Sequence, residues 1–161
     1  MILPADVVIR PATPDDAEAL THLHLDCWDD AYAGLVDRAL LGARRADVPA
    51  RIEKWRANLA ERETLLAETT DGLVGFATAG PARDEDAPAE LEVWALYVRA
   101  AHWGTGVGHA LLQAAIGEHP AYLCVLEGND RAIRFYERQG FRPDGQVSDA
   151  DEGRHVRMVR R

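Results

Sequence analysis

The chain has 161 residues, enough for one domain with a buried core, and 47% of them are hydrophobic, which excludes a disordered segment. Its net charge of −9 disfavours non-specific nucleic-acid binding, because such binding needs a cationic surface. No apolar run approaches the roughly 20 residues of a membrane span, and the first residues do not resemble a signal peptide. We therefore expect a single cytoplasmic domain over residues 1–161 that binds neither nucleic acid nor membrane.

The first 63 residues combine one predicted strand with helical segments. Residues 7–10 are expected to form a short strand. Thr13 and Pro14 then mark a helix start, because Thr is a frequent N-cap and proline suits the first helical position. Apolar residues recur at helical spacing after this start and again over residues 48–60. Residues 28–41 are expected to be an irregular or helical connection.

From residue 64 onward the pattern changes to short strands. Residues 64–68 and 73–79 flank Thr70-Asp71-Gly72, which predicts a hairpin. A charged loop and a third strand, 90–98, follow. The remaining elements are expected to be a helix, a strand, a helix and two strands: 106–118, 121–126, 130–139, 141–147 and 155–160. This order predicts an α/β domain of the α+β type, with a mixed central β-sheet flanked by helices.

The two cysteines and six histidines show no metal-ligand spacing. Cys27 and Cys124 each have apolar neighbours, so we expect both to be buried free thiols. We expect no metal site.

A glycine-rich turn, Trp103-Gly104-Thr105-Gly106-Val107-Gly108, lies between the third strand and the next helix. Glycines permit a tight turn that exposes backbone N–H groups at a helix N-terminus, where anions bind. No lysine follows these glycines as a P-loop requires, and the spacing does not fit the dinucleotide fingerprint. The turn therefore predicts either another kind of diphosphate site or a simple strand-to-helix connection.

A second segment of interest runs over residues 127–141. Asn129 is positioned to cap the helix that follows, and Phe135 and Tyr136 lie on its apolar face. Considered alone, these residues are an ordinary cap and ordinary core side chains.

Together, the two segments resemble the GNAT superfamily of N-acetyltransferases. The first resembles the family pattern [QR]xxGx[GA], with Trp103 in place of the usual Gln or Arg. The second resembles N-x-x-A-x-x-F-Y-x-x-x-G-F, matched by Asn129, Ala132, Phe135, Tyr136, Gly140 and Phe141. The order and separation of the two patterns also match the family.

The resemblance implies an acetyl-CoA-dependent N-acetyltransferase. The strand before the glycine turn would offer backbone groups to the pantetheine, and the Val98 N–H would donate to the thioester carbonyl oxygen as it becomes an oxyanion. Amides of the turn would hold the pyrophosphate. The cofactor-binding residues implied are Leu96, Tyr97, Val98, Trp103, Gly104, Thr105, Gly106, Val107, Gly108, Asn129, Phe135 and Tyr136.

Acyl transfer also needs groups that move protons. The resemblance gives Tyr136 the role of donor to the CoA sulfur. A primary amine must lose a proton, and strict alternation along the strand places Glu92 on one face with Leu96 and Val98, so Glu92 is the first candidate base. Glu90 is the second candidate and a main-chain or water route the third; alternatively both carboxylates are merely solvated.

The acceptor is not identified by the sequence. We expect a small-molecule amine, with Trp28, Tyr32 and Glu90 as candidate acceptor-site residues. The alternatives are a protein N-terminus or lysine as acceptor, a longer acyl group, and a non-catalytic acyl-CoA-binding regulatory module. Pairing through the C-terminal strands would give a homodimer.

Overall fold

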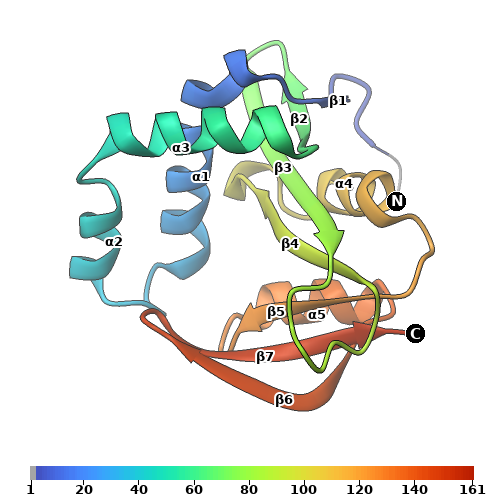
Figure 1. The fold of residues 1–161 in the computed structure, drawn as a ribbon. Helices are drawn as coiled ribbons and strands as arrows, with labels where there is room; N and C mark the ends of the chain where they lie inside the picture. Colours follow the sequence, from blue (N-terminus) through green and yellow to red (C-terminus); the bar gives the residue numbers. More distant parts are fainter. Residues whose placement is uncertain (1–2) are drawn as a thin grey trace.

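Seven strands form one sheet in the order β1-β2-β3-β4-β5-β7-β6, as the computed structural model shows for residues 3–161 (Figure 1). Every neighbouring pair is antiparallel except β4 with β5, which run parallel. The strands are β1 (Val8–Pro11), β2 (Leu65–Thr69), β3 (Gly72–Pro81), β4 (Leu91–Val98), β5 (Ala121–Leu126), β6 (Arg142–Ala150) and β7 (Gly153–Arg160).

Helices cover both faces of the sheet (Figure 1). The helices are α1 (Ala17–Tyr32), α2 (Arg38–Arg44), α3 (Val48–Glu61), α4 (Val107–Ile116) and α5 (Asp130–Arg138). Because side chains alternate along a strand, Leu66 packs with α1 and α3, whereas the next residue, Ala67, packs with α4. The same alternation sends Phe76 to the first layer and Ala77 to the second.

The predicted element types are confirmed, with shifts at the ends. The strand predicted over 121–126 is observed as β5 (Ala121–Leu126). The first helix begins with a separate 3-10 turn, Pro14–Asp16, in which the Thr13 N–H donates to Asp16 Oδ2 at 2.8 Å. The connection predicted over 28–41 holds the end of α1 and the start of α2, which Asp37 caps. Within residues 3–161, no helix has the length and apolar character needed to span a bilayer.

Strands β4 and β5 touch at one point and then separate. Their ladder consists of one residue pair, Glu92 opposite Tyr122, whereas β3 and β4 are paired from Gly75–Val98 to Pro81–Leu91. Toward its C-terminal end, β4 therefore has backbone groups without a partner strand on the β5 side. This separation creates the opening in which the candidate site lies.

A β-bulge at Trp94 changes which face the β4 side chains occupy. Thr78 lies opposite Ala95, but the next residue of β3, Ala79, lies opposite Val93, so Trp94 is the extra residue. Leu96 packs with the layer of α4, whereas Tyr97 packs with the layer of α1. The expectation that Glu92 shares a face with Leu96 and Val98 is therefore wrong, because the bulge interrupts the period of two between them.

Candidate active site

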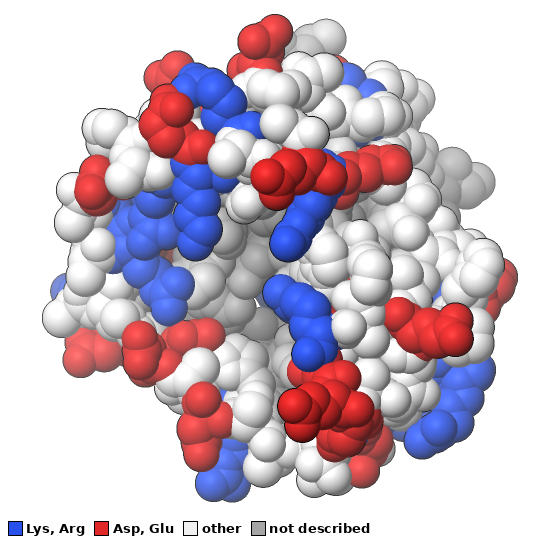
Figure 2. All heavy atoms as spheres, in the orientation of Figure 1, with Lys and Arg blue, Asp and Glu red and all other residues white. Residues whose placement is uncertain are grey.

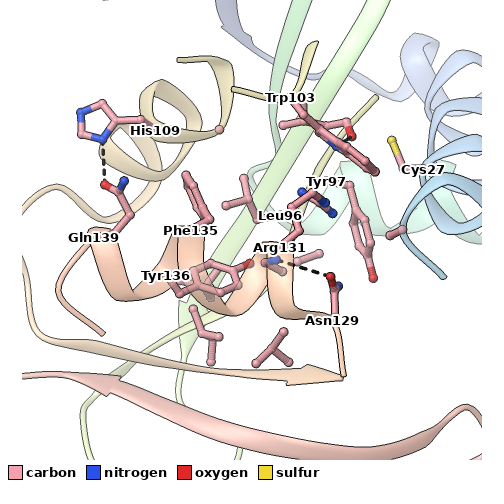
Figure 3. Close-up of a pocket in the computed structure, with 18 of the residues that line it drawn as sticks. Cys27, Leu96, Tyr97, Trp103, His109, Asn129, Arg131, Phe135, Tyr136 and Gln139 are labelled. Carbon is pink, nitrogen blue, oxygen red and sulfur yellow. Dashed lines mark hydrogen bonds between the residues drawn. The ribbon is translucent and has the colours of Figure 1, made fainter. Parts of the chain in front are cut away.

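A cavity of about 430 Å³ occupies the gap between β4 and β5. The C-terminal half of β4 forms one wall, the glycine turn and α4 another, and α5 a third (Figure 3). The structure thus brings together the two sequence segments that were singled out separately. The expected cofactor residues that line the cavity are Leu96, Tyr97, Val98, Trp103, Gly104, Gly106, Gly108, Asn129, Phe135 and Tyr136.

The β4 wall presents backbone groups to this cavity. The N–H of Arg99 donates to the carbonyl oxygen of Val74 at 2.8 Å. This bond makes the neighbouring pair, Gly75 and Val98, a non-hydrogen-bonded pair of the antiparallel ladder. In such a pair the N–H and C=O point away from the partner strand, so the N–H of Val98 faces the opening toward β5, and by the period of two that of Leu96 does as well.

Trp103 fastens the glycine turn to the end of β4. Its indole Nε1–H donates to the carbonyl oxygen of Val98 at 2.8 Å. The guanidinium of Arg131, from α5, lies 3.6 Å from the centre of the indole ring. The residue that departs from the family pattern therefore joins β4, the turn and α5.

The glycines of the turn give α4 an open N-terminus. Gly104 and Gly106 have φ values of +72° and +97°, a region that favours glycine, and a Cβ placed at Gly104 would meet no heavy atom within 4 Å. Gly108 allows close approach of α5, because a Cβ there would lie 3.3 Å from Cζ of Phe135. Thr105 and Val107 do not line the cavity; the Thr105 hydroxyl donates to the carbonyl oxygen of His102, and Val107 is fully buried.

Helix α5 contributes Tyr136 to the cavity, and the N-cap residue before it contributes Asn129 (Figure 3). Oδ1 of Asn129 accepts from the N–H of Ala132 at 3.4 Å, which confirms its role as a cap and leaves its amide group beside the cavity. Tyr136 packs edge-on against Phe135 and Phe141. Burial raises the pKa of Tyr136 above the usual value of a phenol, so the hydroxyl is protonated at neutral pH. Among residues 3–161, no hydrogen-bond partner of this hydroxyl is present, so it can still act as a donor.

The family patterns did not mark several polar residues that line the cavity, among them Arg131, Arg138, Gln139, His102 and His109. Arg131 and Arg138 are seven residues apart on α5 and flank Phe135 on one helical face. This helical spacing is the sequence feature from which their position at the cavity could have been predicted. His109 is held by Gln139, with 2.7 Å between its Nδ1 and the amide oxygen. The two arginines bring positive charge to the side of the cavity formed by α5.

Glu92 lies outside this cavity and is enclosed by its own partners. The backbone N–H, Nε and terminal nitrogen of Arg83 all donate to its carboxylate at 2.8–3.1 Å, and the hydroxyl of Tyr122 donates to Oε1 at 3.0 Å. Burial alone would raise the pKa of Glu92, but the hydrogen bonds and charge of Arg83 lower it below the usual value. Glu90 is exposed and does not line the cavity.

Of the two aromatic acceptor candidates, one lines the cavity and the other does not. Tyr32 lines the cavity, and its hydroxyl lies 3.0 Å from that of Tyr97. Trp28 does not line it; the guanidinium of Arg44 covers its ring at 3.5 Å. Trp28 therefore supports the position of Tyr32, which it contacts edge-on.

The expectation for the cysteines is half correct. Cys27 is buried, but Cys124 is exposed and lines the cavity. Cys124 lies in β5 beyond the single pair that joins β4 and β5, so separation of the strands uncovers it. Among residues 3–161, no group of three or more His, Cys, Asp or Glu side chains is arranged to hold a metal ion.

Comparison with known proteins agrees with this geometry. The model of the family described as "Acetyltransferase (GNAT) family" matches residues 17–141. A probable N-acetyltransferase of Mycobacterium tuberculosis is 28% identical, over 89% of this chain and 84% of its own length. An uncharacterized N-acetyltransferase of Bacillus subtilis is 25% identical, over 94% of this chain and 88% of its own length.

Solved structures show the same fold. The PaiA N-acetyltransferase of Thermoplasma acidophilum, solved in complex with coenzyme A, has a TM-score of 0.72 and 20% identity, over 96% of this chain and 98% of its own. A GCN5-related N-acetyltransferase from Rhodopseudomonas palustris has a TM-score of 0.73 and 20% identity, over 99% and 98%. The family match covers most of the chain and includes both the glycine turn and α5. The chain therefore belongs to the GNAT acetyltransferase family.

Proposed function

We propose that this acyltransferase moves an acetyl group from acetyl-CoA to the primary amine of a small molecule, by direct attack in a ternary complex. The observation that carries the proposal is the cavity between β4 and β5. There the outward backbone of β4 meets the open N-terminus of α4 and the unpartnered hydroxyl of Tyr136, among the described residues 3–161.

The residues present suit coenzyme A. The N-terminus of α4 favours an anion, and positive φ values at Gly104 and Gly106 leave its amides uncovered for a pyrophosphate. Arg131 and Arg138 add positive charge along the same cavity. The Leu96 backbone groups would bind the amide groups of the pantetheine, and the Asn129 side chain would orient it. The related Thermoplasma protein was solved with coenzyme A, which supports this assignment.

Acetyl-CoA supplies an acyl group already activated as a thioester. The N–H of Val98 is fixed by the β3–β4 ladder and would donate to the carbonyl oxygen as negative charge develops there. A preorganised donor of this kind contributes about 3 kcal/mol to the transition state. Trp103 would support that donor, since it binds the carbonyl oxygen of the same residue.

Tyr136 would donate its proton, or a hydrogen bond, to the sulfur that leaves. A thiol has a pKa of about 8.5, so modest assistance suffices for departure. The raised pKa of Tyr136 keeps the proton on the hydroxyl, and the hydroxyl has no competing acceptor among residues 3–161.

The amine proton needs a different route from the one first expected. The Glu92 carboxylate already accepts four hydrogen bonds, and its lowered pKa makes it a weak base. Glu90 lies away from the cavity. The geometry supports the third alternative, in which the proton passes to water at the mouth of the cavity, and it gives Glu92 the role of holding Arg83 and β4 in place.

The proposal is tested by initial-rate kinetics with acetyl-CoA, with thiol release as the signal and separate panels of small amines and peptides as acceptors. A small amine should support turnover, with double-reciprocal lines that intersect, as sequential binding of both substrates requires. Turnover with peptides alone would replace the small-molecule acceptor by a protein. Acetyl-CoA binding without turnover in either panel would instead support a regulatory module.

A further inference from the structure

A second cavity of about 300 Å³ opens beside the first, over the layer of α1 and α3. Residues of α1, α3, β3 and β4 line it, together with Arg62, Thr64 and Arg83. Its cationic side chains are Arg51, Lys54, Arg62 and Arg83, and Lys54 is the single lysine of the chain. No Asp or Glu is among the residues that line it.

This concentration of positive charge contrasts with the rest of the protein. The chain has 27 Asp and Glu against 18 Lys and Arg. Within residues 3–161, nevertheless, Arg51, Lys54 and Arg62 form no ion pair, whereas Arg83 is paired with Glu92. Figure 2 shows Lys and Arg side chains bordering the hollow in the middle of this face. Uncompensated cations around a concave surface attract an anion.

Trp94 connects this cavity to the cofactor cavity, because it lines both. It is the bulge residue of β4, and the guanidinium carbons of Arg62 and Arg83 lie 4.7 and 5.1 Å from the centre of its ring. His24 and Tyr97 form a second connection: their rings are 5.3 Å apart, and each lines a different cavity. A molecule in the second cavity would therefore lie next to the β4 wall of the first.

The state of His24 is consistent with a positive potential in this cavity. Its ring packs against Trp28, Trp55, Phe76 and Tyr97. Burial, followed by the charges of Arg51, Arg44 and Lys54, lowers the pKa of His24 to about 4. The imidazole is therefore neutral at pH 7 and adds no charge to the cavity. Within residues 3–161, the unpaired positive charge comes from Arg51, Lys54 and Arg62.

We propose that this second cavity binds an anionic group, a carboxylate or a phosphate, of the amine that accepts the acetyl group. The inference rests on the proposed function and specifies its acceptor: a small amine with a negative charge, such as an amino acid or a phosphorylated amine. A volume of about 300 Å³ suits a small molecule. Arg51, Lys54 and Arg62 hold the anion, and the amine end extends past Trp94, which lines both cavities, toward the thioester site.

The test is calorimetric titration of the protein, with and without saturating CoA, with matched amines. Each pair differs in one anionic group: glutamate against glutamine, alanine against alaninamide, and phosphoethanolamine against ethanolamine. The first two pairs report on carboxylate and the third on phosphate. The anionic member of at least one pair should bind about tenfold or more tightly than its partner, the gain expected from charge-assisted hydrogen bonds.

Two variants and one control complete the test. Arg51→Gln and Arg62→Gln should each lower the ratio of the two Kd values within a pair by about tenfold. Neither variant should change the Kd of CoA. Arg56→Gln is the control, since Arg56 is an exposed residue of α3 that does not line the cavity. Equal binding within every pair, absence of binding by every anionic amine, or identical behaviour of all three variants would overturn the inference. Failure of the wild-type protein to bind CoA would instead overturn the proposed function. The titrations without CoA would still show whether the second cavity prefers the anionic amine of each pair.

Discussion

The indole Nε1 of Trp103 donates a hydrogen bond of 2.8 Å to the carbonyl oxygen of Val98, so the turn that begins α4 is fixed to the end of β4. In the proposed site, these two segments hold different parts of the same cofactor, the pyrophosphate and the thioester. Their relative position therefore affects both cofactor affinity and rate. The residue that replaces the usual Gln or Arg of the family performs this fastening.

Trp103→Phe should weaken acetyl-CoA binding. The change keeps an aromatic ring under Arg131 but removes the donor to Val98, and a hydrogen bond of this kind contributes about 1 kcal/mol, or about fivefold in Kd. Calorimetric titration measures the effect. An unchanged Kd would mean that the turn keeps its position without this bond.

Tyr136→Phe should lower kcat by about 10²-fold or more, the usual contribution of a proton donor, and leave the Kd of acetyl-CoA nearly unchanged. Thermal stability should also change little, because the lost hydroxyl has no partner among residues 3–161. Tyr122→Phe is the matched control: it removes a hydroxyl that binds Glu92, so it should lower Tm and spare kcat. A Tyr136→Phe enzyme with wild-type kcat would limit Tyr136 to packing.

Glu92→Gln should reduce stability rather than change the pH profile of kcat. The carboxylate anchors Arg83 and Tyr122, and a charged hydrogen bond to a half-exposed partner contributes about 1–2 kcal/mol. The lowered pKa of Glu92 means that this stabilisation is present above the unfolded pKa of about 4.3 and is lost as pH falls through the folded pKa. Unfolding curves of wild type and variant should differ at pH 7 and converge at low pH. A 10²-fold loss of kcat with a displaced pH profile would restore Glu92 as the general base.

The pKa of His24 should be observable by NMR as a titration near pH 4, well below the ordinary value of 6.5. Because the folded protein binds this proton less readily than the unfolded chain, His24 contributes to loss of stability as pH falls from 6.5 toward 4. Arg51→Gln removes one of the nearby charges and should move the titration upward. A pKa near 6.5 in the wild-type protein would contradict the arrangement of charge around this ring.

Local sequence patterns predicted the element types, because capping, turn chemistry and apolar periodicity act over a few residues. That the glycine turn and α5 contribute to one site was implied by the family resemblance, and both segments line the same cavity. The position of Glu92 could not be predicted in this way, since one bulge residue, Trp94, reverses the faces of β4 on either side of it. The exposure of Cys124 depends on where β4 and β5 separate, which involves two strands distant in sequence. The second cavity unites Arg51, Lys54 and Arg62 of the α3 region with Arg83 of a distant loop, so no single segment shows it.

The most direct test of the cofactor site is a calorimetric titration with acetyl-CoA of the wild-type protein, Gly104→Trp and Gly34→Trp. Both glycines have positive φ, +72° and +80°, and open space where a Cβ would be, so both variants carry similar backbone strain. Only Gly104 lines the cavity. We predict micromolar binding by wild type and Gly34→Trp, with affinity at least about 100-fold weaker in Gly104→Trp, a loss of about 2.7 kcal/mol. No binding by the wild-type protein, or equal binding by all three proteins, would contradict the assignment of this cavity to acetyl-CoA.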